Sequence, residues 1–306
     1  MAIKGVWRAV IAPSVAIALL SGCSQATESV ETISDVQPIS VAATTDAPIT
    51  RVIALANGSA EIIASLGYKK ILIGRDIAST SAELRSVEIV TSGHQVIPEK
   101  ILSLNPDLVL IDASTGPASA LKVLENSGIK MVTISEAWST GEIGKKVDEV
   151  AAAIGVSLAG NNLNAAMRDF AQTVPDVPQG TRAAFLYLRG GSAIYLIGGK
   201  GSGADSLFSA MSVRDIGAEN LTTPFTPISA ETLSALNPDI FLVMSKGLES
   251  VGGLSGFLEL PGVAQTNAGR NKAVVAVDDS LLLSFGPRTP ALIASLATSM
   301  NKVLAQ

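Results

Sequence analysis

The chain has 306 residues, of which 47% are apolar and 16% are charged, and its formal net charge is −5. That length is enough for one large domain or two medium ones with a substantial core. The negative charge and the lack of any basic run argue against nucleic acid as a partner. Aromatic residues make up only 4% of the chain, which disfavours a surface that stacks many bases or sugars.

The first residues have the features of an export signal. Two basic residues precede an apolar stretch, Val10 to Leu20, that is too short for an ordinary transmembrane helix. The stretch ends in "LSGC", which resembles the lipobox of bacterial lipoproteins; an ordinary signal peptide with an incidental thiol is the alternative. We predict a lipoprotein signal peptide over residues 1–22 and lipidation of Cys23, with acyl chains that anchor the protein at the extracellular face of the cytoplasmic membrane.

The residues after the lipobox have no helical or strand period. They are rich in Ser, Thr, Ala, Asp and Glu, a composition typical of flexible linkers, and we predict a flexible tether over residues 23–50. Cys23 is the only cysteine, so the chain has no intramolecular disulfide.

From Arg51 onward, short β-branched runs alternate with stretches of helical spacing. The runs typical of buried parallel strands are residues 51–55, 71–76, 107–112 and 130–135. This alternation predicts an α/β lobe over residues 51–138. It resumes after a Pro-rich turn and predicts a second α/β lobe over residues 175–306, ending in a helix from about Pro290 to Leu304.

Residues 139–174 interrupt the alternation with a helical pattern of roughly 35 residues. Ser139 or Thr140 suits its N-cap, and Gly155 and Gly160 are points at which it could break. The predicted fold class is therefore α/β, with two α/β lobes joined by a single long helix.

An internal repeat supports two related lobes. "EKILSLNPDLVLI" begins at Glu99 and "ETLSALNPDIFLV" begins at Glu231. The Asn-Pro-Asp in each copy is a common way to end a helix and start a strand. An acidic residue in a first helical turn also favours the helix dipole, so the two glutamates are open to a structural as well as a functional interpretation.

Several segments together carry a family resemblance: "SGH" before Glu99, "LYLRGGSAIYLIGG", "GSGADSL", "KGLESVGG", "PGVAQTNAGRN" and "LSFGPRTP". Nearly all of residues 51–306 resembles the substrate-binding proteins of bacterial iron-chelate, haem and cobalamin ABC importers, and most of all the hemin-transporter binding lipoproteins. The resemblance implies a monomeric binding protein, not an enzyme, with a ligand cleft between its lobes. It would capture haem for iron acquisition and deliver it to an ABC permease with its ATPase subunits.

The resemblance also implies roles for single residues. His94, the only histidine, and Tyr195 would be the axial ligands of the haem iron, one from each lobe, and both are donors that ferric haem accepts. Arg189 is the candidate cation beside the phenolate, and Arg288 is the candidate partner of a haem propionate. The structural alternatives are a hydrogen-bonding histidine, a core tyrosine and an interlobe arginine, while Tyr187 and Tyr68 are interpreted as structural.

Glu99 and Glu231 match the acidic residues that dock such proteins onto basic pockets of the permease, one in each lobe. Two charges far apart would fix the orientation of the receptor over the pore.

Other ligands and activities are less consistent with the sequence. Zinc or manganese receptors need three or four ligating side chains, and one histidine does not supply them. A siderophore or cobalamin receptor of the same fold remains the main alternative. A hydrolase is disfavoured because no Gly-x-Ser-x-Gly elbow is present, and "GSGADS" lacks the lysine of a phosphate-binding loop.

Overall fold

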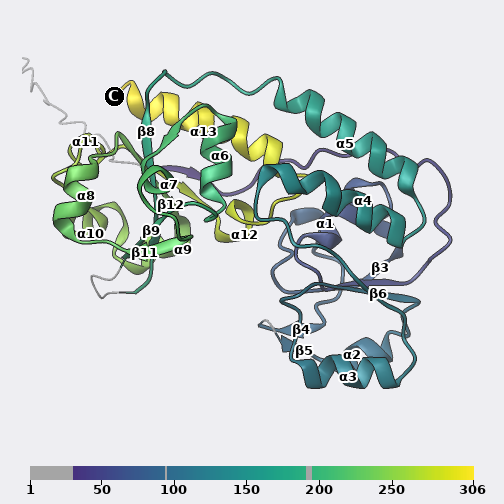
Figure 1. Cartoon of the computed structure of the whole chain (residues 1–306). Coiled ribbons are helices and arrows are strands. Elements are labelled where there is room, and N and C mark those ends of the chain that lie inside the picture. Colours follow the sequence, from purple (N-terminus) through teal and green to yellow (C-terminus); the bar gives the residue numbers. More distant parts are fainter. Residues whose placement is uncertain (1–29, 94, 191–194) are drawn as a thin grey trace, which may run out of the picture.

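The structure, a computed structural model that describes residues 30–93, 95–190 and 195–306, has two α/β lobes (Figure 1). The N-terminal lobe contains a parallel sheet in the order β3-β2-β6-β7. Its strands are β2 (Val52–Ala54), β3 (Leu72–Arg75), β6 (Leu108–Ile111) and β7 (Met131–Thr133). Each falls within a predicted run, so the predicted α/β class is confirmed.

Short helices and one hairpin complete this lobe. The helices are α1 (Ser59–Ser65), η1 (Lys69–Ile71), η2 (Ala82–Leu84), α2 (Pro98–Ser103) and α3 (Ala118–Asn126). The hairpin pairs β4 (Thr91–Ser92) with β5 (Gln95–Val96) in antiparallel fashion. Both faces of the sheet are covered, as its near-continuous apolar strands require: Ile53 and Val109 belong to one apolar cluster, and Val52 and Leu110 to another.

The C-terminal lobe contains a mixed sheet in the order β1-β13-β12-β8-β9-β11, with β10 beside β8. Its strands are β1 (Glu31–Ile33), β8 (Arg182–Leu188), β9 (Tyr195–Gly198), β10 (Arg214–Asp215), β11 (Phe225–Pro227), β12 (Ile240–Met244) and β13 (Val274–Val277). Among the described residues of this sheet, the pairs β8–β9 and β9–β11 are antiparallel and the other pairs are parallel. The helices are α6 (Ala204–Ala210), α7 (Ile216–Asn220), α8 (Ala230–Leu236), α9 (Ser245–Ser250), α10 (Gly253–Glu259), α11 (Asn267–Arg270), α12 (Asp279–Leu282) and α13 (Thr289–Leu304).

The predicted single long helix is wrong. Residues 139–174 form η3 (Thr140–Glu142) and two helices, α4 (Ile143–Ala153) and α5 (Ser157–Ala171). Gly155, with φ +79°, separates the two helices at one of the predicted breaks. Gly160 instead lies inside α5. A Cβ at this position would come within 2.7 Å of the Ala151 side chain, so the absence of a side chain lets α5 pack closely against α4. The Asn164 amide then donates to the Gly144 carbonyl oxygen at 3.1 Å, closing an antiparallel helical hairpin.

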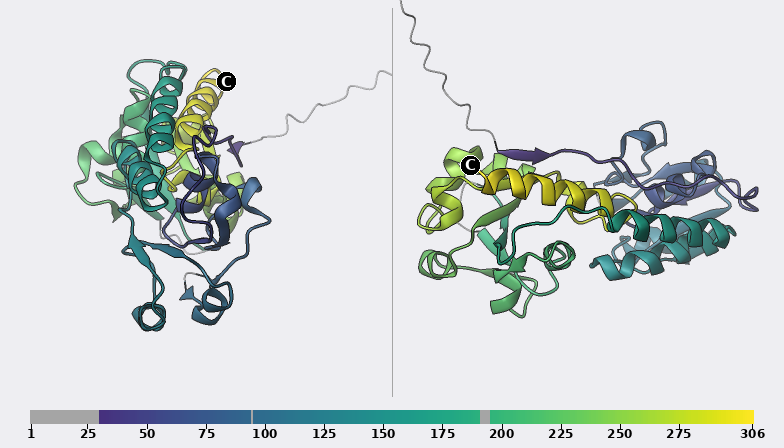
Figure 2. Two further views of the ribbon diagram at one scale, coloured as in Figure 1. Left: turned by 90° about the vertical axis from the view of Figure 1, so that its right-hand side faces the viewer. Right: turned by 90° about the horizontal axis from the view of Figure 1, so that it is seen from above.

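The predicted flexible tether is wrong for residues 30–50. Strand β1 pairs with β13 in the C-terminal sheet, and the segment then extends along the outside to the N-terminal lobe (Figure 2). The Ile39 N–H donates to the Pro287 carbonyl oxygen at 2.9 Å, and the Val41 N–H to that of Ser65 at 2.8 Å. These hydrogen bonds are formed by backbone groups, which every residue carries. The polar side-chain composition that suggested a flexible tether therefore gave no information about them.

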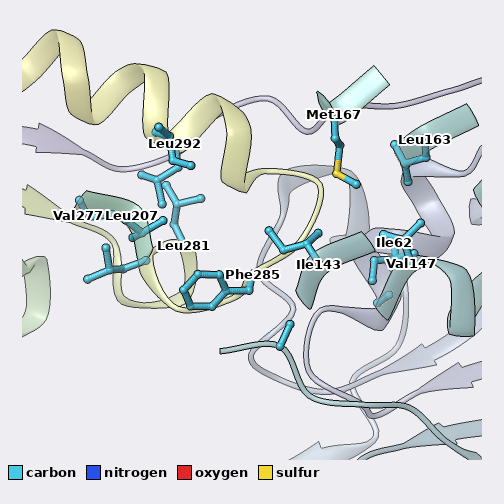
Figure 3. Packing of buried hydrophobic residues seen from close by; sticks show 14 of the residues in the cluster. Ile62, Ile143, Val147, Leu163, Met167, Leu207, Val277, Leu281, Phe285 and Leu292 are labelled. Atoms are coloured by element: carbon cyan, nitrogen blue, oxygen red, sulfur yellow. The ribbon is translucent and has the colours of Figure 1, made fainter. Parts of the chain in front are cut away.

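The two lobes share one apolar core. Figure 3 shows Ile62 from the N-terminal lobe, Leu207, Leu281, Phe285 and Leu292 from the C-terminal lobe, and Ile143, Val147, Leu163 and Met167 from α4 and α5 between them. A dense, continuous core of this kind resists sliding of one lobe over the other.

In the part of the chain that the structure describes, no helix has the length and apolar character needed to cross a membrane.

The internal repeat builds the same junction in both lobes. The Arg51 guanidinium donates to the Leu104 carbonyl oxygen at 2.6 Å, and the Asp107 carboxylate accepts the Arg51 N–H at 3.0 Å. In the C-terminal lobe Arg182 contacts the Leu236 carbonyl oxygen and its N–H donates to Asp239 at 3.1 Å. The structural interpretation of Asn-Pro-Asp is confirmed: it fixes where each helix ends and each buried strand begins.

Candidate functional site: the cleft between the lobes

A cleft of about 340 Å³ lies between the lobes. Its N-terminal wall consists mainly of loops that follow β2, β3 and β6, and its C-terminal wall follows β13. The lining residues used below are Asn57, Asp76, Thr115, Asp279, Ser280 and Ser284. Loops at the carboxyl ends of parallel strands are where open α/β sheets bind ligands, so this is the candidate site.

The buried Asp112 carboxylate organises the N-terminal wall. It accepts the Asn57 N–H at 2.7 Å and the hydroxyls of Ser114 and Thr115, both at 2.8 Å. The loops after β2 and β6 are therefore held together by one side chain. The resulting wall presents hydroxyl and amide groups rather than a row of positive charges.

The mouth of the cleft is bridged by a hydrogen bond between the lobes. The hydroxyl oxygens of Thr80 and Ser280 are 2.6 Å apart. The Ser280 hydroxyl also donates to Asp278 at 2.6 Å. On the N-terminal side, burial raises the pKa of Asp76, whose carboxylate accepts the Ala78 N–H at 2.9 Å. These bonds fix the loop at residues 76–80 against the C-terminal lobe.

A buried lysine lies directly behind the cleft. Lys146 of α4 is 2% exposed, and its ammonium group donates to the carbonyl oxygens of Ser284 and Phe285 at 3.3 and 3.4 Å. Burial lowers its pKa to about 8, although the nearby Asp112 and Glu61 carboxylates favour the charged form. Sequence reasoning missed this residue, although its spacing of three from Ile143 and four from Val150 places it on the apolar face of the helix, unlike the exposed Lys145.

His94 lies outside the described residues, as does Cys23. The neighbours of His94 do border the cleft: Thr91, Gly93 and Val96 all contribute to its lining. The β4–β5 hairpin is therefore part of the candidate site.

The structure does not bring Tyr195 into the cleft. Its side chain is 4% exposed and packs in an apolar cluster with Leu186 and Phe257. Its hydroxyl donates to the Pro261 carbonyl oxygen, and burial, followed by the nearby Glu231 carboxylate, raises its pKa. A phenol that is buried, hydrogen-bonded and harder to ionise is a core residue, so the prediction that it binds iron is corrected.

The structure also contradicts the predicted propionate role of Arg288. This side chain is 3% exposed and donates to the Glu61 carboxylate at 3.0 and 2.5 Å. A third contact joins it to Asp35 at 3.3 Å. Arg288 therefore holds the lobes together as an ion-paired interlobe residue, which was the alternative interpretation.

Arg189 remains exposed, directly after the end of β8. Two residues earlier, Tyr187 is half-buried, with its ring centroid 5.8 Å from that of Phe225. Tyr187 and Arg189 are two positions apart at the carboxyl end of β8, and neither is among the residues that line the described cleft. Tyr187 also packs against the interlobe core, which agrees with its interpretation as a structural residue.

Glu99 and Glu231 are both exposed, in the first turns of α2 and α8. Hydrogen bonds from the Glu231 backbone N–H and the Ser229 hydroxyl lower the pKa of Glu231. The repeat thus places one surface carboxylate at an equivalent point of each lobe.

Comparisons with known proteins agree with this architecture. The periplasmic binding protein family model matches residues 52–281. The chain is 24% identical to YvrC of Bacillus subtilis (strain 168), an uncharacterized ABC transporter substrate-binding lipoprotein, over 97% of this chain and 96% of that one.

Two solved structures are also similar. The heme-binding protein HmuT has 30% identity and a TM-score of 0.70, covering 89% of this chain and 98% of HmuT. The periplasmic heme-binding protein RhuT from Roseiflexus sp. RS-1 has 32% identity and a TM-score of 0.73, covering 84% and 99%. HmuT has also been solved with a histidine, a tyrosine or an arginine replaced by alanine, the last two being two positions apart.

The family and these neighbours are binding proteins rather than enzymes. The match extends over most of both lobes, including the strands whose carboxyl ends border the cleft. The chain therefore belongs to the periplasmic binding protein family.

Proposed function

We propose that this protein captures haem in the interlobe cleft and delivers it to an ABC importer for iron acquisition. The observation that carries the proposal is the similarity to HmuT at 30% identity over 89% of the chain, together with a cleft at the strand ends where that fold binds ligands. Haem is the transported cargo here, and the protein supplies the groups that hold it.

We assign His94 and Tyr187 as the axial ligands of the haem iron, one from each lobe. The β4–β5 hairpin borders the cleft on both sides of position 94, and Tyr187 is the penultimate residue of β8. The tyrosine and the arginine that were replaced in the HmuT variants have the same two-residue spacing as Tyr187 and Arg189, and a histidine was the third residue replaced. The role of Arg189 is electrostatic: a free phenol has a pKa of about 10, and a neighbouring cation favours the phenolate that binds ferric iron.

The remaining expectations concern the cell surface. We propose that Cys23 carries the lipid anchor, that the protein works as a monomer at the extracellular face of the membrane, and that Glu99 and Glu231 dock it on the permease. YvrC, which matches along almost its full length, is itself described as a lipoprotein of an ABC transporter. The exposure of both glutamates at equivalent points of the two lobes supports docking through paired charges.

Visible absorption during a hemin titration tests the ligand. The full chain in mild detergent is titrated with hemin, and the spectrum of hemin in the same detergent without protein is subtracted. A saturable Soret shift is the expected result. Parallel titrations with cyanocobalamin and with a ferric siderophore test the main alternative, and a chain that binds either of these but not hemin contradicts the proposal.

A further inference from the structure

An exposed tryptophan stands at the same sheet edge as the cleft. Trp138 is the only tryptophan after Cys23, and its side chain is 52% exposed. It follows β7, and the Ile134 N–H at the start of this segment donates to the Ile111 carbonyl oxygen of β6 at 2.7 Å. Neighbouring strands lie about 4.8 Å apart, so the loop after β7 continues the row of loops that lines the cleft.

The polar groups of Trp138 are already paired. Its indole N–H donates to Glu136 at 3.0 Å, and its backbone N–H donates to Glu142 at 2.9 Å. Among the described residues its ring forms no stacked or edge contact with another aromatic ring. What the side chain offers is a large apolar ring face whose indole N–H is held by one hydrogen bond, and such faces serve in aromatic recognition.

This segment also meets the C-terminal lobe. The Thr140 N–H donates to the Ser206 hydroxyl of α6 at 3.2 Å. Ala137, beside Trp138, is buried in the interlobe core that includes Phe285. Trp138 therefore lies where the two lobes converge, and a ligand held between the lobes is a natural neighbour for its ring.

We infer that Trp138 is a ligand-contacting residue that packs its indole face against the flat macrocycle bound between the lobes. The inference rests on the proposed function and extends it, because the contact recognises the aromatic macrocycle and not the iron. A planar macrocycle bound at the carboxyl ends of the strands spans several adjacent loops. It therefore extends beyond the described cleft toward the end of β7. Stacking of this kind is independent of the metal.

The test compares hemin with iron-free protoporphyrin IX. Both are titrated into the full chain and into the variants Trp138→Ala, Trp138→Phe and His94→Ala, following the visible spectrum. Trp138→Ala should weaken binding of both compounds by about tenfold, whereas Trp138→Phe should stay within about threefold of the parent. His94→Ala should weaken hemin binding only. Leu158→Ala, which removes a 60% exposed side chain from α5, is the matched control and should change neither.

The outcomes separate this inference from the proposed function. If the parent binds hemin and Trp138→Ala binds both compounds as tightly as the parent, the stacking role is wrong while haem binding stands. If Trp138→Ala weakens hemin binding but leaves protoporphyrin binding unchanged, the contact is with the iron site, and the inference is again wrong. A parent that binds neither compound contradicts the proposed function and this inference together. Thermal unfolding of each variant identifies any that fails to fold. If Trp138→Ala fails, Trp138→Leu replaces it: it keeps an apolar side chain without the aromatic face, so it should weaken binding of both compounds, and parent-like binding of both would contradict the inference.

Discussion

The Arg288 guanidinium of the C-terminal lobe forms two hydrogen bonds, at 3.0 and 2.5 Å, with the Glu61 carboxylate of the N-terminal lobe. Both side chains are buried, and burial raises the pKa of Glu61 even though Arg288 opposes the shift. The pair joins the start of α13 to α1 across 227 positions of sequence. It fixes the relative orientation of the lobes at the side of the shared core.

Breaking this pair should cost much of the stability of the protein. Arg288→Met leaves Glu61 buried without its partner, and we expect the free energy of unfolding to fall by about 3–5 kcal/mol. The double variant Glu61→Leu with Arg288→Met removes both charges and should recover a large part of the loss. Denaturant titration measures each value. Arg214→Met is the control, because it removes an exposed ion pair with Glu219 and should change the free energy of unfolding little. If Arg288→Met lowers that free energy no more than Arg214→Met does, the interlobe role is contradicted.

Lys146 should make stability depend on pH. Its pKa is about 8 in the folded protein and 10.5 when exposed, so between these values the unfolded chain binds more protons. Stability should therefore rise with pH over this range, by up to about 3 kcal/mol from this group. Urea unfolding of the parent and of Lys146→Met at pH 7.5 and pH 10 measures the slope, meaning the change in the free energy of unfolding per pH unit. This slope should be smaller in Lys146→Met than in the parent. Lys145→Met, next in sequence but exposed, should keep the slope of the parent; equal slopes in both variants refute the prediction.

Charge reversal at the docking glutamates should separate binding from transport. Glu99→Lys and Glu231→Lys change exposed carboxylates outside the described cleft lining, so hemin binding should keep its affinity. Uptake of hemin by cells that depend on this receptor should fall, since each reversal opposes a basic pocket. Glu125→Lys, an exposed carboxylate on α3, is the matched control. Loss of hemin binding in either docking variant would show that the glutamates belong to the ligand site instead.

Local patterns predicted the fold well. The β-branched runs became β2, β3, β6 and β7, and Gly155 marked the break between α4 and α5. The repeat predicted two equivalent helix-to-strand junctions. The sequence did not show that α5 folds back onto α4 instead of continuing it as one helix. That arrangement depends on the close packing of Gly160 against Ala151, a tertiary contact that no local pattern indicates.

The site was predicted only in part, for reasons of distance and of burial. Arg288 pairs with Glu61, which lies 227 positions earlier in the sequence, so no local pattern indicated the ion pair. Tyr195 lies on a sheet that is buried on both faces, where strands show no alternation to indicate which side chains reach the cleft. Tyr187 was interpreted as structural, and its proposed role as a ligand depends on where β8 ends relative to the cleft, which the sequence alone does not give.

Hemin spectra of three variants test the assignment of the ligands most directly. With the full chain, His94→Ala and Tyr187→Phe should each shift the Soret band away from that of the parent complex and weaken binding. Tyr195→Phe should lower stability, because it loses the bond to the Pro261 carbonyl oxygen, while leaving the Soret band of the hemin complex unchanged. A Tyr187→Phe complex with the spectrum of the parent, or a Tyr195→Phe complex with an altered one, would contradict the account.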